Sequence, residues 1–128
     1  MLLLDTCSLI WLVEDLSALS GNAKKAIRQN SDDIYVSAIS ALEISLLVVK
    51  KRLELPSQPF KWYSDALRLH GLKEITVDGQ IAAISGNLPP VHKDPCDRIV
   101  IATAIVKKLD IVTADKIFME YRHIKVIW

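Results

Sequence analysis

Four acidic residues lie at or near the ends of short apolar runs, where carboxylates from distant parts of a chain can meet. They are Asp5, Glu43, Asp97 and Asp115. Carboxylate oxygens that converge on one point are the ligands that Mg²⁺ or Mn²⁺ prefers. The positions of these acids therefore raise the hypothesis of a divalent-metal site.

Helix capping is the simpler explanation for the same acids, because helix N-termini favour negatively charged side chains. Ser40 and Glu43 match a capping box, in which each side chain bonds to the backbone N–H of the other residue. Asp94 precedes Pro95 and Asp97, which is the order expected of an N-cap followed by proline at the first helical position. In a parallel sheet all such caps lie at one edge, so clustering alone does not separate capping from a shared site.

The surroundings of two of the acids favour the metal. Glu43 has alanine, leucine and isoleucine neighbours in a helix start that should be largely buried, and Asp97 precedes an apolar run at residues 99–102. Ionised carboxylates are expensive to bury without a partner. No lysine or arginine is placed to neutralise all four acids, since Arg98 points off a different part of its helix.

Apolar runs alternate along the chain with amphipathic stretches, which predicts the elements that must bring the acids together. We expect strands at residues 1–4, 34–36, 72–77, 110–113 and 124–127. We expect helices at residues 8–13, 20–29, 41–53, 60–69, 79–85, 95–108 and 116–121. Such alternation is typical of an α/β domain with a mainly parallel sheet, whose ligands bind beyond the carboxyl ends of the strands.

Composition places the chain among single folded domains. Its 128 residues are 51% hydrophobic and 24% charged, which fits one domain over residues 1–128. A net charge of +1 argues against a mainly electrostatic binder of nucleic acids or membranes. The two cysteines form no CxxC pair and no Cys/His cluster, which argues against a zinc ribbon. We expect neither a secretory signal nor a membrane span, and therefore a cytoplasmic protein.

Around the four acids, the sequence resembles the PIN-domain nucleases, and within them the VapC-type toxins of prokaryotic toxin–antitoxin systems. The resemblance rests on four blocks in the family's order, which are LLLDTCSL at 2–9, VSAISALEI at 36–44, HKDPCDRIVIATA at 92–104 and LDIVTAD at 109–115. Together they cover nearly the whole chain. The third block commonly carries an aromatic residue where this chain has Cys96, a departure that concerns packing more than chemistry.

The resemblance implies a three-layer PIN-like fold with a mainly parallel sheet of about five strands. It also implies that the quartet of acids binds one or two Mg²⁺ or Mn²⁺ ions and hydrolyses RNA phosphodiester bonds. Thr6 and Thr113 match family positions that support the site through hydroxyl hydrogen bonds. Asp94 is an ambiguous acid that fits an N-cap better than a ligand.

An RNA substrate, a cognate antitoxin protein and a homodimer are further implications of the resemblance. Arg98 and Lys116 are candidates to contact RNA phosphates, with a solvated surface charge as the alternative for each. His92 is expected as a loop residue rather than a catalyst. Trp62 and Tyr63 could lie at a dimer or partner surface, although such aromatics are usually buried in a core. The competing function is a catalytically inactive PIN-like module that binds RNA or a protein partner.

Overall fold

In the computed structural model, which describes residues 1–128, five parallel strands form one sheet with the first strand at its centre. The order is β3-β2-β1-β4-β5. In chain order, the bounds of β1 to β5 are Leu2–Leu4, Ile34–Ser37, Lys73–Ile75, Asp110–Val112 and Val126–Ile127. Leu3 of β1 pairs with Tyr35 of β2 and with Ile111 of β4. All the carboxyl ends therefore lie at the same edge, and the expected α/β fold with a parallel sheet is confirmed.

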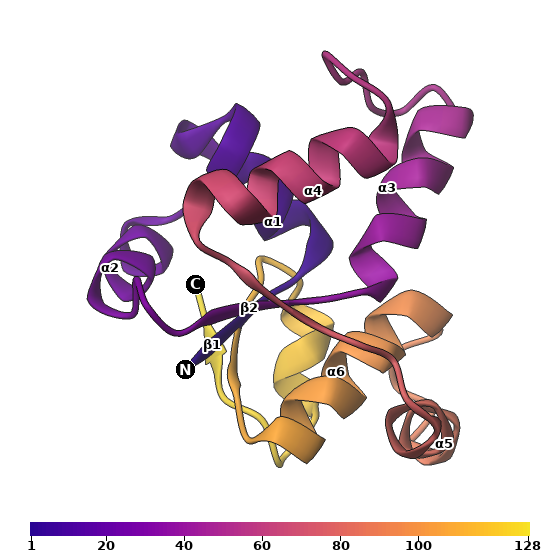
Figure 1. Cartoon of the computed structure of the whole chain (residues 1–128). Coiled ribbons are helices and arrows are strands. Elements are labelled where there is room, and N and C mark those ends of the chain that lie inside the picture. Colours follow the sequence, from indigo (N-terminus) through magenta and orange to yellow (C-terminus); the bar gives the residue numbers. More distant parts are fainter.

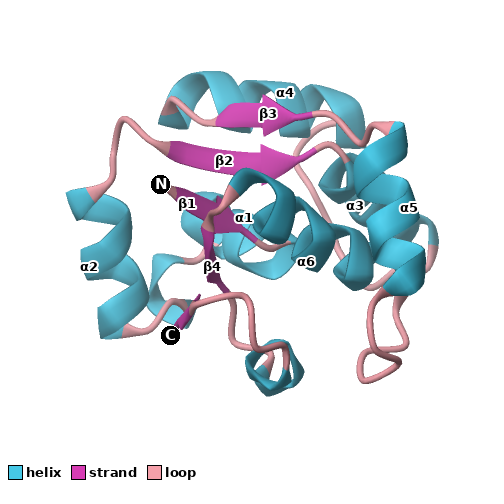
Figure 2. Ribbon diagram, turned by 90° about the horizontal axis from the view of Figure 1, so that it is seen from below, coloured by secondary structure: helices cyan, strands magenta, loops and turns pink.

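Helices connect the strands and cover both faces of the sheet (Figures 1 and 2). The α-helices are α1 Thr6–Glu14, α2 Gly21–Gln29, α3 Ile39–Val49, α4 Pro59–His70, α5 Gly79–Asn87 and α6 Pro95–Lys107. Two 3₁₀ helices, η1 Leu16–Ala18 and η2 Lys116–Glu120, complete the elements. Figure 1 shows α1, α2 and α4 on one side of the strands, and α5 and α6 on the other. None of the helices is long and apolar enough to cross a membrane.

The central strand β1 is buried on both faces because its alternate side chains enter two separate cores. Leu2 and Leu4 pack in one core with Trp62 of α4 and other side chains of the helices on that face. Leu3 enters the opposite core, where Ile101 of α6 is also fully buried. The strand is thus held from both sides, and the residue that follows it, Asp5, has a fixed position.

The expected elements are present, with changes at their ends. The helix expected at 41–53 is α3, which ends at Val49 because Lys51 adopts a positive φ of 58° that a helix cannot continue through. The strand expected at 72–77 keeps only the residues of β3 that pair with β2. Gly71 closes α4, as expected, in the left-handed conformation that glycine adopts without strain.

Candidate metal centre

The four acids of the quartet lie near the carboxyl edge of the sheet, around the end of β1. Asp5 follows β1 directly, and Asp115 lies just beyond the neighbouring strand β4. Glu43 projects from the beginning of α3, which follows β2, and Asp97 lies in the first turn of α6. The parallel topology therefore gathers side chains from four separate segments of the chain.

Asp5 is anchored at both of its carboxylate oxygens. Oδ1 accepts the backbone N–H of Ser8 at 2.8 Å, so Asp5 is the N-cap of α1. Oδ2 accepts the hydroxyl of Thr113, which stands at the end of β4. Only 7% of Asp5 is exposed. A buried carboxylate in this position is held by hydrogen bonds alone and faces no positive side chain.

Glu43 is held by the start of α1 rather than by its own helix. Its Oε1 accepts the hydroxyl of Thr6 at 2.6 Å, and the hydroxyls of Thr6 and Ser40 lie 2.9 Å apart. The capping box expected of Ser40 and Glu43 is therefore wrong. Helix α3 begins at Ile39, with Ala38 as an N-cap that makes no side-chain bond, so Ser40 already lies inside the helix.

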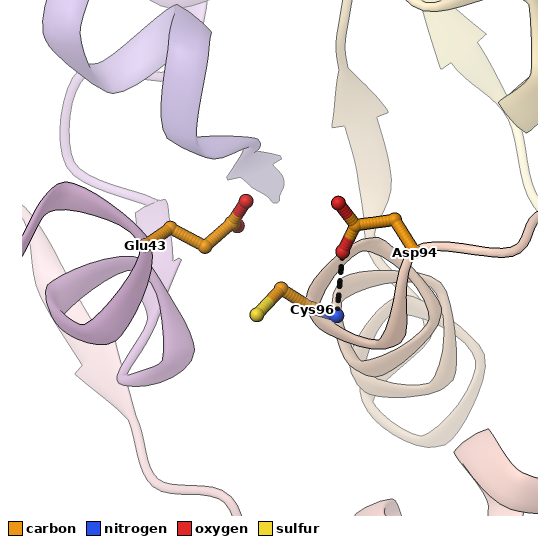
Figure 3. A group of neighbouring side chains, drawn as sticks. All are labelled: Glu43, Asp94 and Cys96. Carbon is orange, nitrogen blue, oxygen red and sulfur yellow. Dashed lines mark hydrogen bonds between the residues drawn. The ribbon is translucent and has the colours of Figure 1, made fainter. Parts of the chain in front are cut away.

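Asp94 caps α6 and also faces the quartet. Its Oδ1 accepts the backbone N–H of Cys96 at 2.8 Å and that of Asp97 at 3.3 Å. Figure 3 shows the Glu43 side chain extending from α3 toward Asp94 and Cys96 at the start of α6. Oxygen and sulfur atoms of these three side chains lie within 4.8 Å of one another. The capping role expected of Asp94 is present, and it places a fifth carboxylate beside the quartet.

His92 joins the other two acids of the quartet and was not expected to. Its Nε2 lies 2.9 Å from Oδ2 of Asp115 and 3.1 Å from Oδ2 of Asp97. The residue belongs to the loop before α6, as expected, but only 7% of it is exposed. Its ring lies nearly perpendicular to that of Phe118 in η2, with the centroids 5.4 Å apart. The sequence signal was its position five residues before Asp97, which places a loop side chain within reach of the helix start.

Crowding and burial make the ionised quartet unfavourable on its own. Burial, together with the charges of Glu43, Asp94, Asp5 and Asp115, raises the pKa of Asp97 to about 8. Burial also raises the pKa of Asp5 and of Glu43. The ion pairs that lysine and arginine make in this structure all involve other acids, namely Asp33, Asp65 and Asp110. The centre therefore lacks a permanent positive charge.

The donor set fits a hard divalent cation. It consists of partly buried carboxylate oxygens of like charge, and a divalent ion would offset both the burial and the repulsion that raise the Asp97 pKa. His92 could add an imidazole only by giving up its contacts with the two acids. Zinc sites with thiolate ligands fit less well, because burial and the neighbouring carboxylates raise the pKa of the Cys96 thiol to about 11.

The two cations expected to hold phosphate differ in the structure. Arg98 donates to the carbonyls of Leu88 at 2.8 Å, Pro89 at 3.0 Å and His92 at 3.1 Å, so its guanidinium holds the loop before α6. This arrangement disfavours the phosphate contact expected of Arg98, because both terminal nitrogens of its guanidinium already donate to carbonyls within the chain. Lys116 is exposed at the start of η2, directly after Asp115, and remains a candidate.

Trp62 and Tyr63 do not lie on a surface. Both are buried within α4, with 4% and 2% of their surface exposed, so the partner-surface interpretation is wrong. The Trp62 indole donates to Glu14 at 2.6 Å and the Tyr63 hydroxyl donates to Glu74 at 2.7 Å. Their polar tips reach hydrogen-bond partners at the edge of the core, which explains how two large amphipathic rings are accommodated.

Comparison with known proteins agrees with this geometry. The model of the PIN domain family matches residues 2–124. The chain belongs to the PIN-domain family. It is 31% identical to Ribonuclease VapC22 of Mycobacterium tuberculosis over 122 residues, which is 94% of this chain and 92% of that protein.

Solved structures share the PIN fold at lower identity. The chain resembles one in a DNA-bound VapBC complex from Salmonella typhimurium, with a TM-score of 0.67 and 17% identity over 98% of this chain and 95% of that one. It also resembles one in VapBC2 of Rickettsia felis bound to a promoter fragment, with a TM-score of 0.69 and 15% identity over 98% and 96%. The expected PIN-like fold is thereby confirmed.

Proposed function

We propose that residues 1–128 act as one PIN domain that hydrolyses RNA phosphodiester bonds with Mg²⁺ or Mn²⁺, as the toxin of a toxin–antitoxin pair. The observation that carries this proposal is the convergence of the four acids, without lysine or arginine, at the carboxyl edge of a parallel sheet. The kinship with a ribonuclease along almost the whole chain supports RNA as the substrate. The cytoplasm is the expected place for such an activity.

The metal would be held by Asp5, Glu43, Asp97 and Asp115, and Asp94 is better explained as a helix cap. When bound, a divalent ion lowers the pKa of water and stabilises charge on a phosphate. The four carboxylates would fix the position of the ion at the sheet edge. Hydrogen bonds from the threonine hydroxyls and from His92 hold these carboxylates in place.

In the proposed reaction, water attacks the phosphorus in line with the bond to the 3′ oxygen. That bond breaks, the attacking water gives up a proton and the leaving oxygen takes one, which gives a 3′-hydroxyl and a 5′-phosphate. Lys116 is an exposed cation directly after Asp115 and is proposed to contact a phosphate of the RNA. The structure favours Lys116 over Arg98 for this contact, since the Arg98 donors are engaged with loop carbonyls.

A protein partner is the second part of the proposal. The structures that resemble this chain are those of toxin–antitoxin complexes, which supports an antitoxin as a partner. Leu42, Leu46 and Val49 follow one face of α3 and are 48%, 40% and 76% exposed. Helical apolar stripes of this kind are commonly covered by another protein. We propose that a second copy of the chain covers this stripe on α3. Sedimentation of Leu46→Lys beside the unmodified chain would test this by comparing their oligomeric states.

RNA cleavage by the purified chain tests the enzymatic proposal. Mixed tRNA and structured RNA would be incubated with Mg²⁺, Mn²⁺ or EDTA. Asp5→Asn and Asp97→Asn keep the shape of the side chain and remove its charge, and Asp33→Asn is the matched control, because Asp33 lies on the surface beside Lys73. Cleavage that needs metal and is lost only in the first two variants supports the proposal. If no metal supports cleavage and none alters the melting temperature, the inactive PIN-like module is favoured.

A further inference from the structure

Resting on the proposed metal centre, a further role follows from the contacts of His92. We propose that His92 is a positioning residue, which orients the carboxylates of Asp97 and Asp115 through a single N–H group. Its Nε2 lies within hydrogen-bond distance of one oxygen of each acid, at 3.1 Å and 2.9 Å. The two acids come from different segments, the start of α6 and the loop after β4, so the imidazole links two independent parts of the site.

The position of the hydrogen on the imidazole follows from its other nitrogen. Nδ1 of His92 accepts the backbone N–H of Asp94 at 3.2 Å, so Nδ1 acts as an acceptor and the hydrogen lies on Nε2. This N–H is shared between the two carboxylates. The ring therefore offers a directed donor to both acids, as histidine can when its second nitrogen is fixed by the backbone.

The surroundings prevent the imidazole from turning away. Its ring packs nearly perpendicular to that of Phe118 with the centroids 5.4 Å apart, and 7% of the residue is exposed. The backbone N–H of His92 donates to the Tyr121 hydroxyl at 2.8 Å, and its carbonyl accepts Arg98 at 3.1 Å. Arg98 and Tyr121 thus each hold the backbone of the loop at His92, whereas the ring itself is held by Phe118 and by the backbone N–H of Asp94. This gives Arg98 a clear role that does not involve phosphate.

Every carboxylate of the quartet then has at least one oxygen fixed by a donor from the chain. Thr113 fixes Asp5, Thr6 fixes Glu43, and His92 fixes both of the others. Donors behind the ligands of a metal commonly change its affinity about 10- to 100-fold when removed. Loss of the imidazole N–H should free two ligands at once.

Two substitutions separate this role from simple packing of the loop. His92→Phe keeps a ring against Phe118 but removes the donor, whereas His92→Gln loses the ring but offers an amide N–H near the place of Nε2. The Mn²⁺ dissociation constant of the metal-free full chain would be measured by titration calorimetry at pH 7.5. We expect His92→Phe to weaken Mn²⁺ about tenfold or more, and His92→Gln to stay within about threefold of the unmodified chain.

Tyr121→Phe is the control, because it removes a hydroxyl that holds the same loop and leaves the imidazole contacts in place. We expect it to lower the melting temperature and leave Mn²⁺ affinity within about threefold. The inference is overturned if His92→Phe binds Mn²⁺ as well as the unmodified chain or more tightly, or if His92→Gln binds as weakly as His92→Phe. If the unmodified chain binds no Mn²⁺, the proposed metal centre fails, and this inference fails with it.

Discussion

Replacing Asp97 by asparagine should stabilise the metal-free protein while abolishing its proposed activity. Burial and four neighbouring carboxylates raise the pKa of this side chain from 3.8 to about 8. Between these two pH values the folded chain keeps a proton that the unfolded chain releases. Stability therefore falls as the pH rises from about 4 to about 8, and the loss is complete above that range.

The size of the effect follows from the same pKa change. At about 1.4 kcal/mol for each pH unit, the full displacement corresponds to roughly 6 kcal/mol. Because 22% of the side chain is exposed, solvent screening should reduce the realised effect to about 2–3 kcal/mol. Asparagine resembles the protonated acid at every pH. Asp97→Asn should thus gain about 2–3 kcal/mol at pH 8 and only about 0.5 kcal/mol at pH 5.

Thermal unfolding in EDTA at pH 5 and pH 8 provides the measurement. For a chain of this length, we expect Asp97→Asn to melt about 6–10 °C above the unmodified chain at pH 8 and about 1–2 °C above it at pH 5. Asp65→Asn is the control, since Asp65 is paired with Lys61 and Arg68 and its pKa is lowered. It should be slightly less stable at both pH values. An Asp97→Asn gain that is absent, or equal at the two pH values, would refute the electrostatic reasoning.

Three further outcomes are expected. Thr113→Val removes the hydroxyl that holds Asp5, so it should lower stability by about 1–3 kcal/mol in urea unfolding and weaken Mn²⁺ binding in calorimetry; unchanged values would contradict the anchoring role. Arg98→Lys should lower the free energy of unfolding by about 2 kcal/mol, because one ammonium cannot reach all the carbonyls. A variant of unchanged stability that lost only RNA affinity in filter binding would instead support a phosphate contact. Burial raises the pKa of the Cys96 thiol to about 11, so iodoacetamide at pH 8.5 should label the native thiol on the order of 100-fold more slowly than the same thiol in the chain unfolded in urea. Peptide mass spectrometry would follow the labelling, and equal rates would contradict the raised pKa.

The fold could be predicted from sequence because its signals are local. Apolar runs and their alternation with helices indicated five strands in a parallel sheet, and Gly71 marked the end of α4 through its own backbone preference. The four acids could be found for the same reason, since each stands next to an apolar run. Helix capping is confirmed for three acids, as Asp5, Asp94 and Asp115 accept backbone N–H groups at helix starts, while the shared metal site stays a prediction.

What the sequence did not reveal depends on contacts between distant segments. Ser40 satisfies the capping-box pattern, but Thr6, far away in the chain, lies against its hydroxyl and also binds Glu43. The role of His92 depends on where the loop before α6 meets the end of β4, which no local pattern contains. Arginine is a residue type that often binds phosphate, and only the folded loop shows that Arg98 donates to backbone carbonyls instead.

The place of β1 at the centre of the sheet has a consequence for folding during synthesis on the ribosome. During synthesis β1 leaves the ribosome before β4, so one edge of this central strand stays unpaired until β4 has been made. Asp5 obtains the Thr113 hydroxyl only then, at a separation of 108 residues. Contacts of such long range are made late in folding. A ribosome that has not yet made β4 would therefore carry a chain without the proposed catalytic centre, and the RNA beside it would not be cleaved.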